Sequence, residues 1–98
     1  MKYYILEGTF IENHPTGDEL KKVMGEHFAY LKVGLENGSV SLSGPKTGGD
    51  GGIVIVKSDN IEDFCNEDPF VRQGVQKYRV LEFSPNEYLD CLKEWAKQ

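Results

Sequence analysis

The sequence predicts a small α+β domain in which helices cover one face of a single antiparallel sheet. Strand-like and helix-like segments follow one another in the order β-α-β-β-α-β, which is typical of the ferredoxin-like, or split βαβ, arrangement. The length of 98 residues allows one domain. We therefore assign residues 1–98 to one domain with a core over about 1–83. A capping box at Ser84 and Glu87 predicts an additional C-terminal helix over about 85–97.

The first strand and the first helix carry the clearest signals. Residues 2–10 alternate along the chain and are apolar on both faces near their start, as in a strand that is covered on both sides. Thr16 and Glu19 have the spacing of a capping box, which predicts a helix over about 17–36. The helix is expected to stop before Gly38, because glycine readily adopts the left-handed conformation. The apolar stripe of this helix consists of Leu20, Val23, Met24, Phe28, Leu31 and Leu35.

Shorter segments complete the expected core. Strands are predicted over residues 40–43, 53–57 and 75–83. Asp59 and Glu62 are expected to begin a short helix. A second helical turn is expected at Asp68 and Pro69, with the aspartate as cap and the proline in the first helical position.

The two-sided strands also predict self-association. Residues 53–57 are apolar on both faces, like the first strand, whereas the helices of this arrangement cover only one face of the sheet. An uncovered apolar face is typical of an interaction surface, and a second copy of the same sheet is the simplest partner. The sequence therefore predicts a homodimer that pairs face to face.

Composition excludes several classes of function. Eleven Lys and Arg residues against sixteen Asp and Glu residues give a net charge of −5, which leaves no electrostatic footprint for a nucleic acid. No apolar run approaches the ~20 residues that span a bilayer, and the first residues lack the pattern of a signal peptide, so no membrane partner is expected. Cys65 and Cys91 are too few for a disulfide scaffold, and we expect two reduced, structural thiols in a cytoplasmic protein.

His27 is the most informative single residue, because it lies inside the apolar stripe of the first helix, one turn from Val23 and Leu31. The pattern alone favours a hydrogen-bonded core histidine over a catalyst, but either role needs a partner, since an unpaired buried N–H costs about 1–3 kcal/mol. Asp68 is the candidate partner. A carboxylate would select the tautomer and support a general base near neutral pH. The competing role of Asp68, favoured by its spacing, is to cap the turn that begins at Pro69.

The glycine-rich stretch GPKTGGDGG, residues 44–52, is a weak candidate for a phosphate loop. It lacks the GxxxxGK[ST] order, and no helix follows it. We expect a flexible hairpin between two strands that acts as a lid over a pocket, with the Ser43 hydroxyl where the strand ends. Metal binding is not expected, because His14 and His27 match no ligand spacing and no HExxH motif is present.

An ordered set of short motifs resembles the YCII-related family: His27-Phe28-Ala29-Tyr30-Leu31, Gly38, Ser43-Gly44-Pro45, Gly51-Gly52, and Asp68-Pro69-Phe70 with Gly74. The similarity extends from the first strand to about Phe83. It implies a ferredoxin-like fold that pairs as a dimeric α/β barrel. It also implies an active-site pair that corresponds to His27 and Asp68, with Ser43 similar to a residue that lines the same pocket.

The resemblance implies less about the reaction. Some members of the family are linked to elimination or dehydrohalogenation of hydroxylated aromatics, and the related muconolactone-isomerase-like barrels act on similar small rings. This chain departs from the family pattern in the short, glycine-rich loop of residues 46–50 and in the segment after Pro85. Both departures are expected to change access to the pocket.

Two functions from different classes follow. In the first, the protein is an enzyme in which His27 acts as general acid and base, Asp68 orients it, and Ser43 donates a hydrogen bond to a substrate oxygen, with Gly44 and Pro45 beside it in the substrate-binding segment. A proton shift or elimination on a small aromatic or enol-type compound needs no cofactor and no metal. In the second, the protein is a non-catalytic ligand-binding or accessory dimeric module, in which the same pair only ties the first helix to the following loop.

Overall fold

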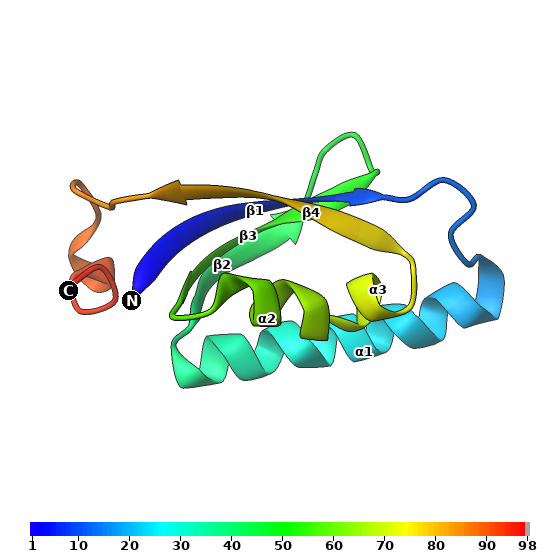
Figure 1. Cartoon of the computed structure of the whole chain (residues 1–98). Coiled ribbons are helices and arrows are strands. Elements are labelled where there is room, and N and C mark those ends of the chain that lie inside the picture. The colour runs from blue at the N-terminus through cyan, green and yellow to red at the C-terminus, as the bar shows by residue number, and fades with distance from the viewer. Residues whose placement is uncertain (98) are drawn as a thin grey trace.

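The computed structural model describes residues 1–97, which form a four-stranded antiparallel sheet with helices on one face (Figure 1). The strands lie in the order β2-β3-β1-β4, and their bounds are β1 Lys2–Phe10, β2 Val40–Pro45, β3 Gly51–Ser58 and β4 Gln76–Phe83. The helices are α1 Gly17–Asn37, α2 Ile61–Glu67 and α3 Pro69–Arg72. This mixed architecture is compatible with the ferredoxin-like α+β fold that the sequence predicts.

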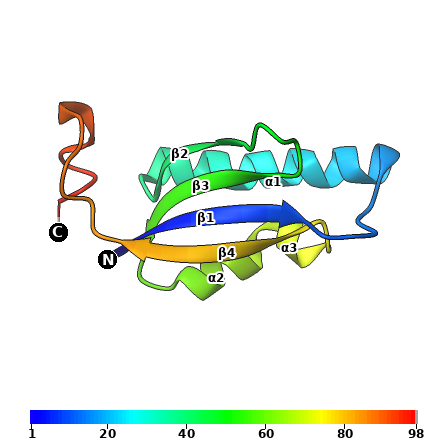
Figure 2. The ribbon, with the colours of Figure 1, turned by 90° about the horizontal axis from the view of Figure 1, so that it is seen from above.

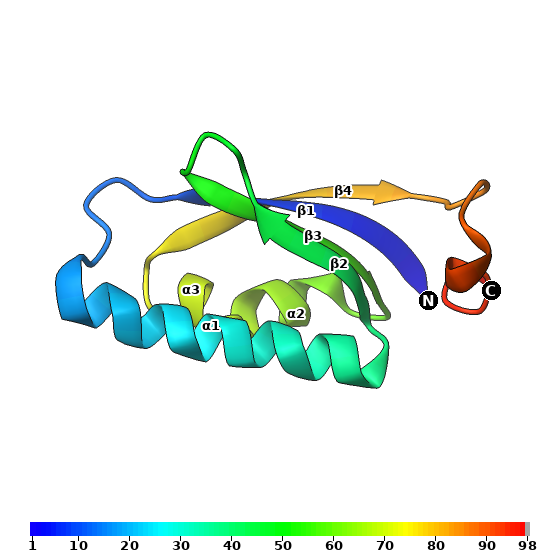
Figure 3. The ribbon, with the colours of Figure 1, turned by 180° about the vertical axis from the view of Figure 1, so that it is seen from behind.

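The helices divide the inner face of the sheet between them. Seen from above, α1 lies under the β2–β3 side, whereas α2 and α3 lie under β4 (Figure 2). Figure 3 shows α1 running below β2 along that edge of the sheet. Gly34 permits the close approach, because a Cβ atom at this position would lie 2.5 Å from Cγ2 of Val40 on β2. None of the helices in the described part of the chain is long and apolar enough to cross a membrane.

The start of α1 differs in detail from the prediction. Thr16 occupies the N-cap position, but its side chain makes no capping hydrogen bond, so the expected box with Glu19 is wrong. The reason is the backbone of Gly17, whose φ of 63° lies outside the right-handed helical region and turns the chain between cap and helix. The other end is confirmed: Gly38 ends the helix in the left-handed conformation with φ 85°.

The cap of α2 is also shifted by one residue. Asn60, not Asp59, precedes the helix, and its side-chain oxygen accepts a hydrogen bond from the backbone N–H of Asp63 at 3.1 Å. The prediction of Asp59 with Glu62 is therefore wrong, although the helix itself is present. The Asn60 amide nitrogen also donates a hydrogen bond to the Asp63 carboxylate at 3.0 Å, a second contact between the same two residues.

The predicted C-terminal helix over 85–97 is wrong. After β4, the described residues form only a 3₁₀ helix, η1 Asp90–Leu92, followed by a turn. Short helices depend on burial of an apolar face, and Leu89 on the expected apolar side is 73% exposed. The segment is held by its end instead: the Trp95 indole donates a hydrogen bond to the Gly38 carbonyl at 2.8 Å, and its ring meets the Tyr3 ring edge-on.

The buried core consists of two clusters on the inner face. The larger contains Tyr4, Leu6, Leu31, Val40, Val54, Val56 and Cys65. The smaller contains Val23, Phe70 and Val75. Along α1, His27 lies between Val23 of one cluster and Leu31 of the other, so a polar side chain occupies the boundary between two apolar regions.

The outer face of the sheet carries a row of aliphatic side chains, which we call the open-face row. Ile5 on β1 pairs with Ile55 on β3 and with Leu81 on β4, and Ile55 pairs in turn with Leu42 on β2. Directly paired residues of antiparallel strands point to the same side, so the row crosses all four strands. Leu42 and Leu81 are more than half exposed. The prediction that β1 and β3 carry apolar side chains on both faces of the sheet is therefore confirmed.

Candidate functional site

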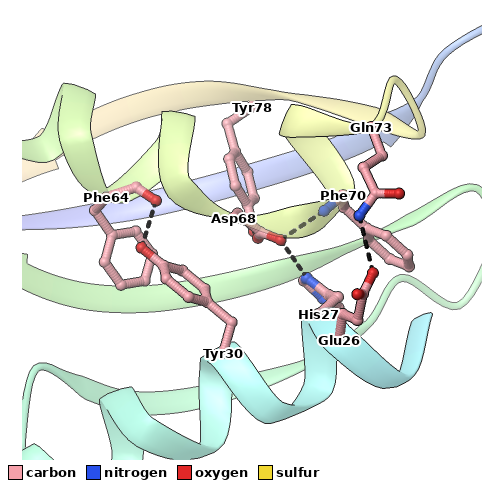
Figure 4. A network of polar contacts seen from close by, with 8 residues as sticks. All are labelled: Glu26, His27, Tyr30, Phe64, Asp68, Phe70, Gln73 and Tyr78. Atoms are coloured by element: carbon pink, nitrogen blue, oxygen red, sulfur yellow. Dashed lines mark hydrogen bonds and ion pairs between the residues drawn. The ribbon is translucent and has the colours of Figure 1, made fainter. Parts of the chain in front are cut away.

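The fold brings His27 of α1 and Asp68, the cap of α3, into direct contact. Nδ1 of His27 lies 2.7 Å from Oδ1 of Asp68 (Figure 4). The two side chains are buried, with residue exposures of 7% for His27 and 0% for Asp68. The contact predicted between residues 41 positions apart is confirmed.

Asp68 performs both of the roles that the sequence left as alternatives. Its Oδ1 atom accepts a hydrogen bond from the backbone N–H of Phe70 at 2.9 Å, and this bond caps α3. The same oxygen makes the contact with His27. Its Oδ2 atom accepts the hydroxyl of Tyr78 on β4 at 2.5 Å. A carboxylate has two oxygens and several lone pairs, so capping and pairing do not compete. Each contact to a buried carboxylate also offsets part of its desolvation.

Tyr78 is a permanent donor in this network. Burial, followed by the charge of Asp68 and the hydrogen bond to it, raises the pKa of the Tyr78 hydroxyl far above its ordinary value. The phenol therefore stays protonated over the whole physiological range, and Asp68 is held as its acceptor. A short O–H···O contact is typical of a hydrogen bond to an ionised oxygen.

The ring of His27 is oriented by stacking as well as by Asp68. The Phe70 ring lies parallel to the imidazole, with centroids 4.0 Å apart and 9° between planes. Because Asp68 is an acceptor, we assign the imidazole proton to Nδ1. Nε2 then carries a free lone pair, and it makes no hydrogen bond to any other residue within 1–97.

Two further hydrogen bonds flank His27 and hold α1 against the short helices. One turn after His27, the Tyr30 hydroxyl donates to the Phe64 carbonyl of α2 at 2.8 Å. Immediately before His27, the Glu26 carboxylate accepts from the Gln73 amide at 2.8 Å (Figure 4). The imidazole is therefore held on an element that is fixed on both sides of it, as a site with defined geometry requires.

A cavity of about 480 Å³ opens beside His27, between α1 and the β2–β3 hairpin. Ser43, Gly44 and Pro45, the segment expected to bind substrate, all line it together with His27. Asp68 does not line the cavity. Of the pair that the family resemblance implies, His27 lines it, and Asp68 is fully buried behind the imidazole. The apolar part of the wall consists of Phe10, Met24, Phe28, Leu31, Leu35, Ile53, Val54 and Phe70.

The glycine-rich hairpin forms part of the same cavity. Gly49, Gly51 and Gly52 line it, as a lid would. The base of the hairpin is anchored, because Nζ of Lys46 lies 3.0 Å from the Thr9 hydroxyl on β1 and the Lys46 N–H donates to the Gly51 carbonyl at 2.9 Å. Glycine is required at residue 51, where φ is 146° and a Cβ atom would lie 1.9 Å from the Gly8 carbonyl oxygen.

Comparison with known families identifies this architecture. The family model of the YCII-related domain matches residues 1–84. The chain belongs to the YCII-related domain family. No curated protein matches the chain. The match covers all four strands and the three α-helices, and it ends where the C-terminal segment with η1 begins.

Sequence reasoning missed three polar cavity residues of this YCII-related domain: Lys32 on α1, and the pair Gln76 and Tyr78. Both members of the pair lie on β4, two positions apart, and therefore point to the same inner face. The available signal was this alternation: a glutamine and a tyrosine at inward positions place polar atoms against the helices. This alternation could not identify cavity residues without the register of β4 against β1, which pairs Gln76 with Phe10 and Tyr78 with Gly8.

The two cysteines, Cys65 within the YCII-related domain and Cys91 after it, lie outside the cavity lining. Cys65 is buried and Cys91 is exposed, and both are free thiols. Burial, followed by the charge of Asp68, raises the pKa of Cys65 to about 11. Its thiol is protonated at neutral pH, which agrees with the structural role expected for it. Residues 1–97 contain no cluster of three or more His, Cys, Asp or Glu side chains that could hold a metal ion.

Proposed function

We propose that this YCII-related protein is a small-molecule enzyme that uses His27 and Asp68 for general acid–base proton transfer. The observation that carries the proposal is the position of His27: Nδ1 contacts Asp68 at 2.7 Å while the ring lines a cavity of about 480 Å³. One ring nitrogen is thus committed to a buried carboxylate, and the other is free to exchange a proton with a molecule in the cavity.

Asp68 gives the imidazole its direction. With the proton held on Nδ1, Nε2 of His27 removes a proton from a carbon or hydroxyl of the substrate, and the carboxylate stabilises the imidazolium that forms. In an isomerisation, the same proton returns to a different substrate atom. In an elimination, the electrons of the broken C–H bond form a double bond while the leaving group departs with its own electron pair. Both steps balance without an added oxidant or reductant.

The β2 segment supplies the complementary group. Ser43 pairs with Val54 of β3, whose buried side chain points toward the helices, so the Ser43 side chain lies on the inner side of the sheet. Its hydroxyl can donate to a substrate oxygen on which charge develops. Gly44 and Pro45 continue the wall beside it. The large apolar share of the lining favours a small aromatic or enol-type substrate.

The test is turnover in a screen of small enols and halogenated phenols, with His27→Ala beside the wild-type protein. We expect the variant to lose about 10²–10⁴-fold in turnover, the range of general acid–base contributions. Ser43→Ala should lose less, because it removes one hydrogen bond and leaves the base intact. Unchanged turnover in His27→Ala would eliminate the assignment.

The alternative is a non-catalytic ligand-binding or accessory module, and the deep burial of the pair favours it. In that case the contact between His27 and Asp68 serves only to join α1 to α3. His27→Ala would then lower the free energy of unfolding while the affinity for a cavity ligand changed little. Thermal unfolding and ligand titration of this one variant separate the two functions.

We further propose that two copies pair through their outer sheet faces, in a reducing, cytoplasmic compartment that suits two free thiols. The open-face row supports the pairing, since Leu42, Ile55, Ile5 and Leu81 form one apolar band across the sheet. Sedimentation at micromolar concentration should give a dimer that Leu81→Asp dissociates. Val33→Asp is the matched control, an equally large change at an exposed valine of α1. A wild-type monomer would contradict the pairing.

A further inference from the structure

Gln76 stands out among the cavity residues because its polar side chain is buried without a partner. The residue is 3% exposed and lines the cavity from the inner face of β4. None of the side-chain hydrogen bonds among residues 1–97 involves its carboxamide. Because no side-chain N or O atom that is closed off from solvent lacks a partner, the carboxamide atoms must be reached from the cavity. An amide that faces a cavity without a partner in the protein bonds to water or to a bound molecule, so the Gln76 carboxamide is available to a ligand.

The position of this carboxamide depends on a glycine in the neighbouring strand. A Cβ atom at Gly8 would lie 2.5 Å from Oε1 of Gln76 and 2.8 Å from its Cδ. The Gln76 side chain therefore lies across β1 in the space that the missing side chain of Gly8 leaves free. Any larger residue at position 8 would have to displace the carboxamide from the cavity wall.

The charges around the cavity are one-sided. Lys32 is the charged side chain that lines it, and no Asp or Glu of the described residues is part of the wall. This contrasts with the chain as a whole, in which acidic residues outnumber basic ones by sixteen to eleven. Lys32 is exposed, which places it at the opening, and it belongs to none of the ion pairs among residues 1–97. Asp68 lies behind this wall, where His27, Tyr78 and a backbone N–H contact its oxygens, so the charge that a ligand meets at the wall itself is that of Lys32. A positive charge at the opening attracts a negatively charged ligand.

We infer that this cavity binds a ring-sized organic anion, with Gln76 orienting its oxygen atoms and Lys32 balancing its charge at the opening. The carbon body of the ligand packs on the apolar wall, which includes Phe28 and Phe70. A cavity of about 480 Å³ is within the range of small-molecule sites. The inference rests on the proposed function in taking this cavity as the substrate site, and it adds the charge of the ligand and the residues that recognise it.

The test uses benzoate and benzamide, two probes of nearly the same shape that differ in charge. Titration of each into the full chain, followed by amide chemical shifts at low ionic strength, gives the dissociation constants. We expect benzoate to bind about tenfold more tightly than benzamide, with the largest shifts at cavity residues that include Gln76. Equal affinity, shifts confined to other surfaces, or no binding of benzoate at millimolar concentration would overturn the inference.

Two variants assign the charge. Lys32→Gln should weaken benzoate binding about two- to fivefold, as expected of an exposed charge, and leave benzamide unaffected. Lys22→Gln is the matched control, since it removes an equal charge from the same helix at an exposed residue that does not line the cavity. Equal weakening by both variants would mean that only the overall charge matters and would exclude Lys32 as the charge partner.

Two further variants assign the hydrogen bonds. Gln76→Leu should weaken both probes about tenfold, yet leave the unfolding temperature nearly unchanged, because the carboxamide faces the cavity and has no partner in the protein. Gly8→Ala should weaken both probes similarly by displacing the same carboxamide. If Gln76→Leu strongly lowers the unfolding temperature while the probes bind as before, Gln76 is a structural residue and the inference is wrong.

The outcomes also separate this inference from the proposed function. Benzoate binding that depends on Lys32 and Gln76, with no turnover of any compound, would support the anion site and contradict the proposed enzyme function. Turnover of a neutral ring compound that needs His27, without benzoate binding, would support the proposed enzyme function and contradict the anion site.

Discussion

The two faces of the sheet each hold a carboxylate with several donors, but in opposite surroundings. On the inner face, Asp68 is fully buried and accepts from His27, Tyr78 and a backbone N–H. On the outer face, Glu7 of β1 accepts from Arg79 at 3.1 Å and Lys46 at 3.3 Å and is open to solvent. The two carboxylates make similar hydrogen bonds and ion pairs, but water competes only for the contacts of Glu7. The comparison teaches that burial, more than the number of contacts, decides what such a network contributes.

The largest expected effect is the removal of the buried carboxylate. Asp68→Ala leaves His27, the Tyr78 hydroxyl and the N–H of Phe70 without their acceptor, and we expect it to lower the free energy of unfolding by about 3–5 kcal/mol. Urea denaturation followed by circular dichroism measures this. The variant Asp68→Asn retains one acceptor oxygen. Its free energy of unfolding should therefore lie between those of Asp68→Ala and the wild-type protein. If Asp68→Ala lowered the free energy of unfolding as little as a surface mutation does, burial would not distinguish the two carboxylates.

A smaller effect is expected from the phenol that holds Asp68. Tyr78→Phe removes one donor from a carboxylate that keeps two others, and we expect a loss of about 1–3 kcal/mol in the free energy of unfolding. If the proposed function is correct, turnover also falls, because the carboxylate that orients His27 is less restrained. Equal stability of Tyr78→Phe and wild type would indicate that Oδ2 of Asp68 finds another donor when the hydroxyl is removed.

Alkaline pH should weaken the inner side selectively. Burial is the main cause that raises the pKa of Cys65 from 9.0 to about 11 and that of Tyr30 from 10.0 to about 12. Folded pKa values above the unfolded ones mean that the stabilisation is complete below the unfolded value and is lost as pH rises through the folded one. Unfolding free energies measured from pH 8 to 12 should therefore decline above pH 9. Cys65→Ala should remove the earliest part of the decline, whereas Cys91→Ala should not.

The smallest effect is expected on the outer face. Hydrogen bonds from Arg79 and then Lys46 lower the pKa of Glu7, so its contribution is present above the unfolded value of 4.5 and is lost as pH falls. Because the group is exposed, Glu7→Gln should move the urea midpoint less than Tyr78→Phe does, and added salt should reduce the difference further. A midpoint shift as large as that of Asp68→Ala would show that this carboxylate, which is exposed in the single chain, is shielded from water in solution.

Much of the fold was predictable because its signals are local. The period of two in β1 gave bounds that coincide with the observed Lys2–Phe10, and Gly38 placed the end of α1 within one residue. The C-terminal helix failed for the opposite reason. Its apolar residues suggested an amphipathic helix, but its structure is set by the distant Gly38 carbonyl that binds Trp95, a contact that local sequence does not report.

The site divides in the same way. The contact between His27 and Asp68 was predictable from the need of a buried imidazole for a partner and from the family resemblance. That Asp68 both caps α3 and binds His27 was not predictable, because spacing along the chain does not reveal how the two carboxylate oxygens are shared. Gln76 and Tyr78 were missed since their roles depend on the register of β4 beside Gly8.

The anchoring of Trp95 has a practical consequence for optical experiments. It is the only tryptophan in the chain, and it lies in the C-terminal segment, outside residues 1–84 that form the family core. Its indole contacts Tyr3, Gly38 and the Lys57 ammonium at one end of the sheet. Intrinsic fluorescence therefore reports the docking of this tail, whereas circular dichroism reports the sheet and helices. A fluorescence transition that precedes the dichroism transition would identify the tail as a separately melting unit.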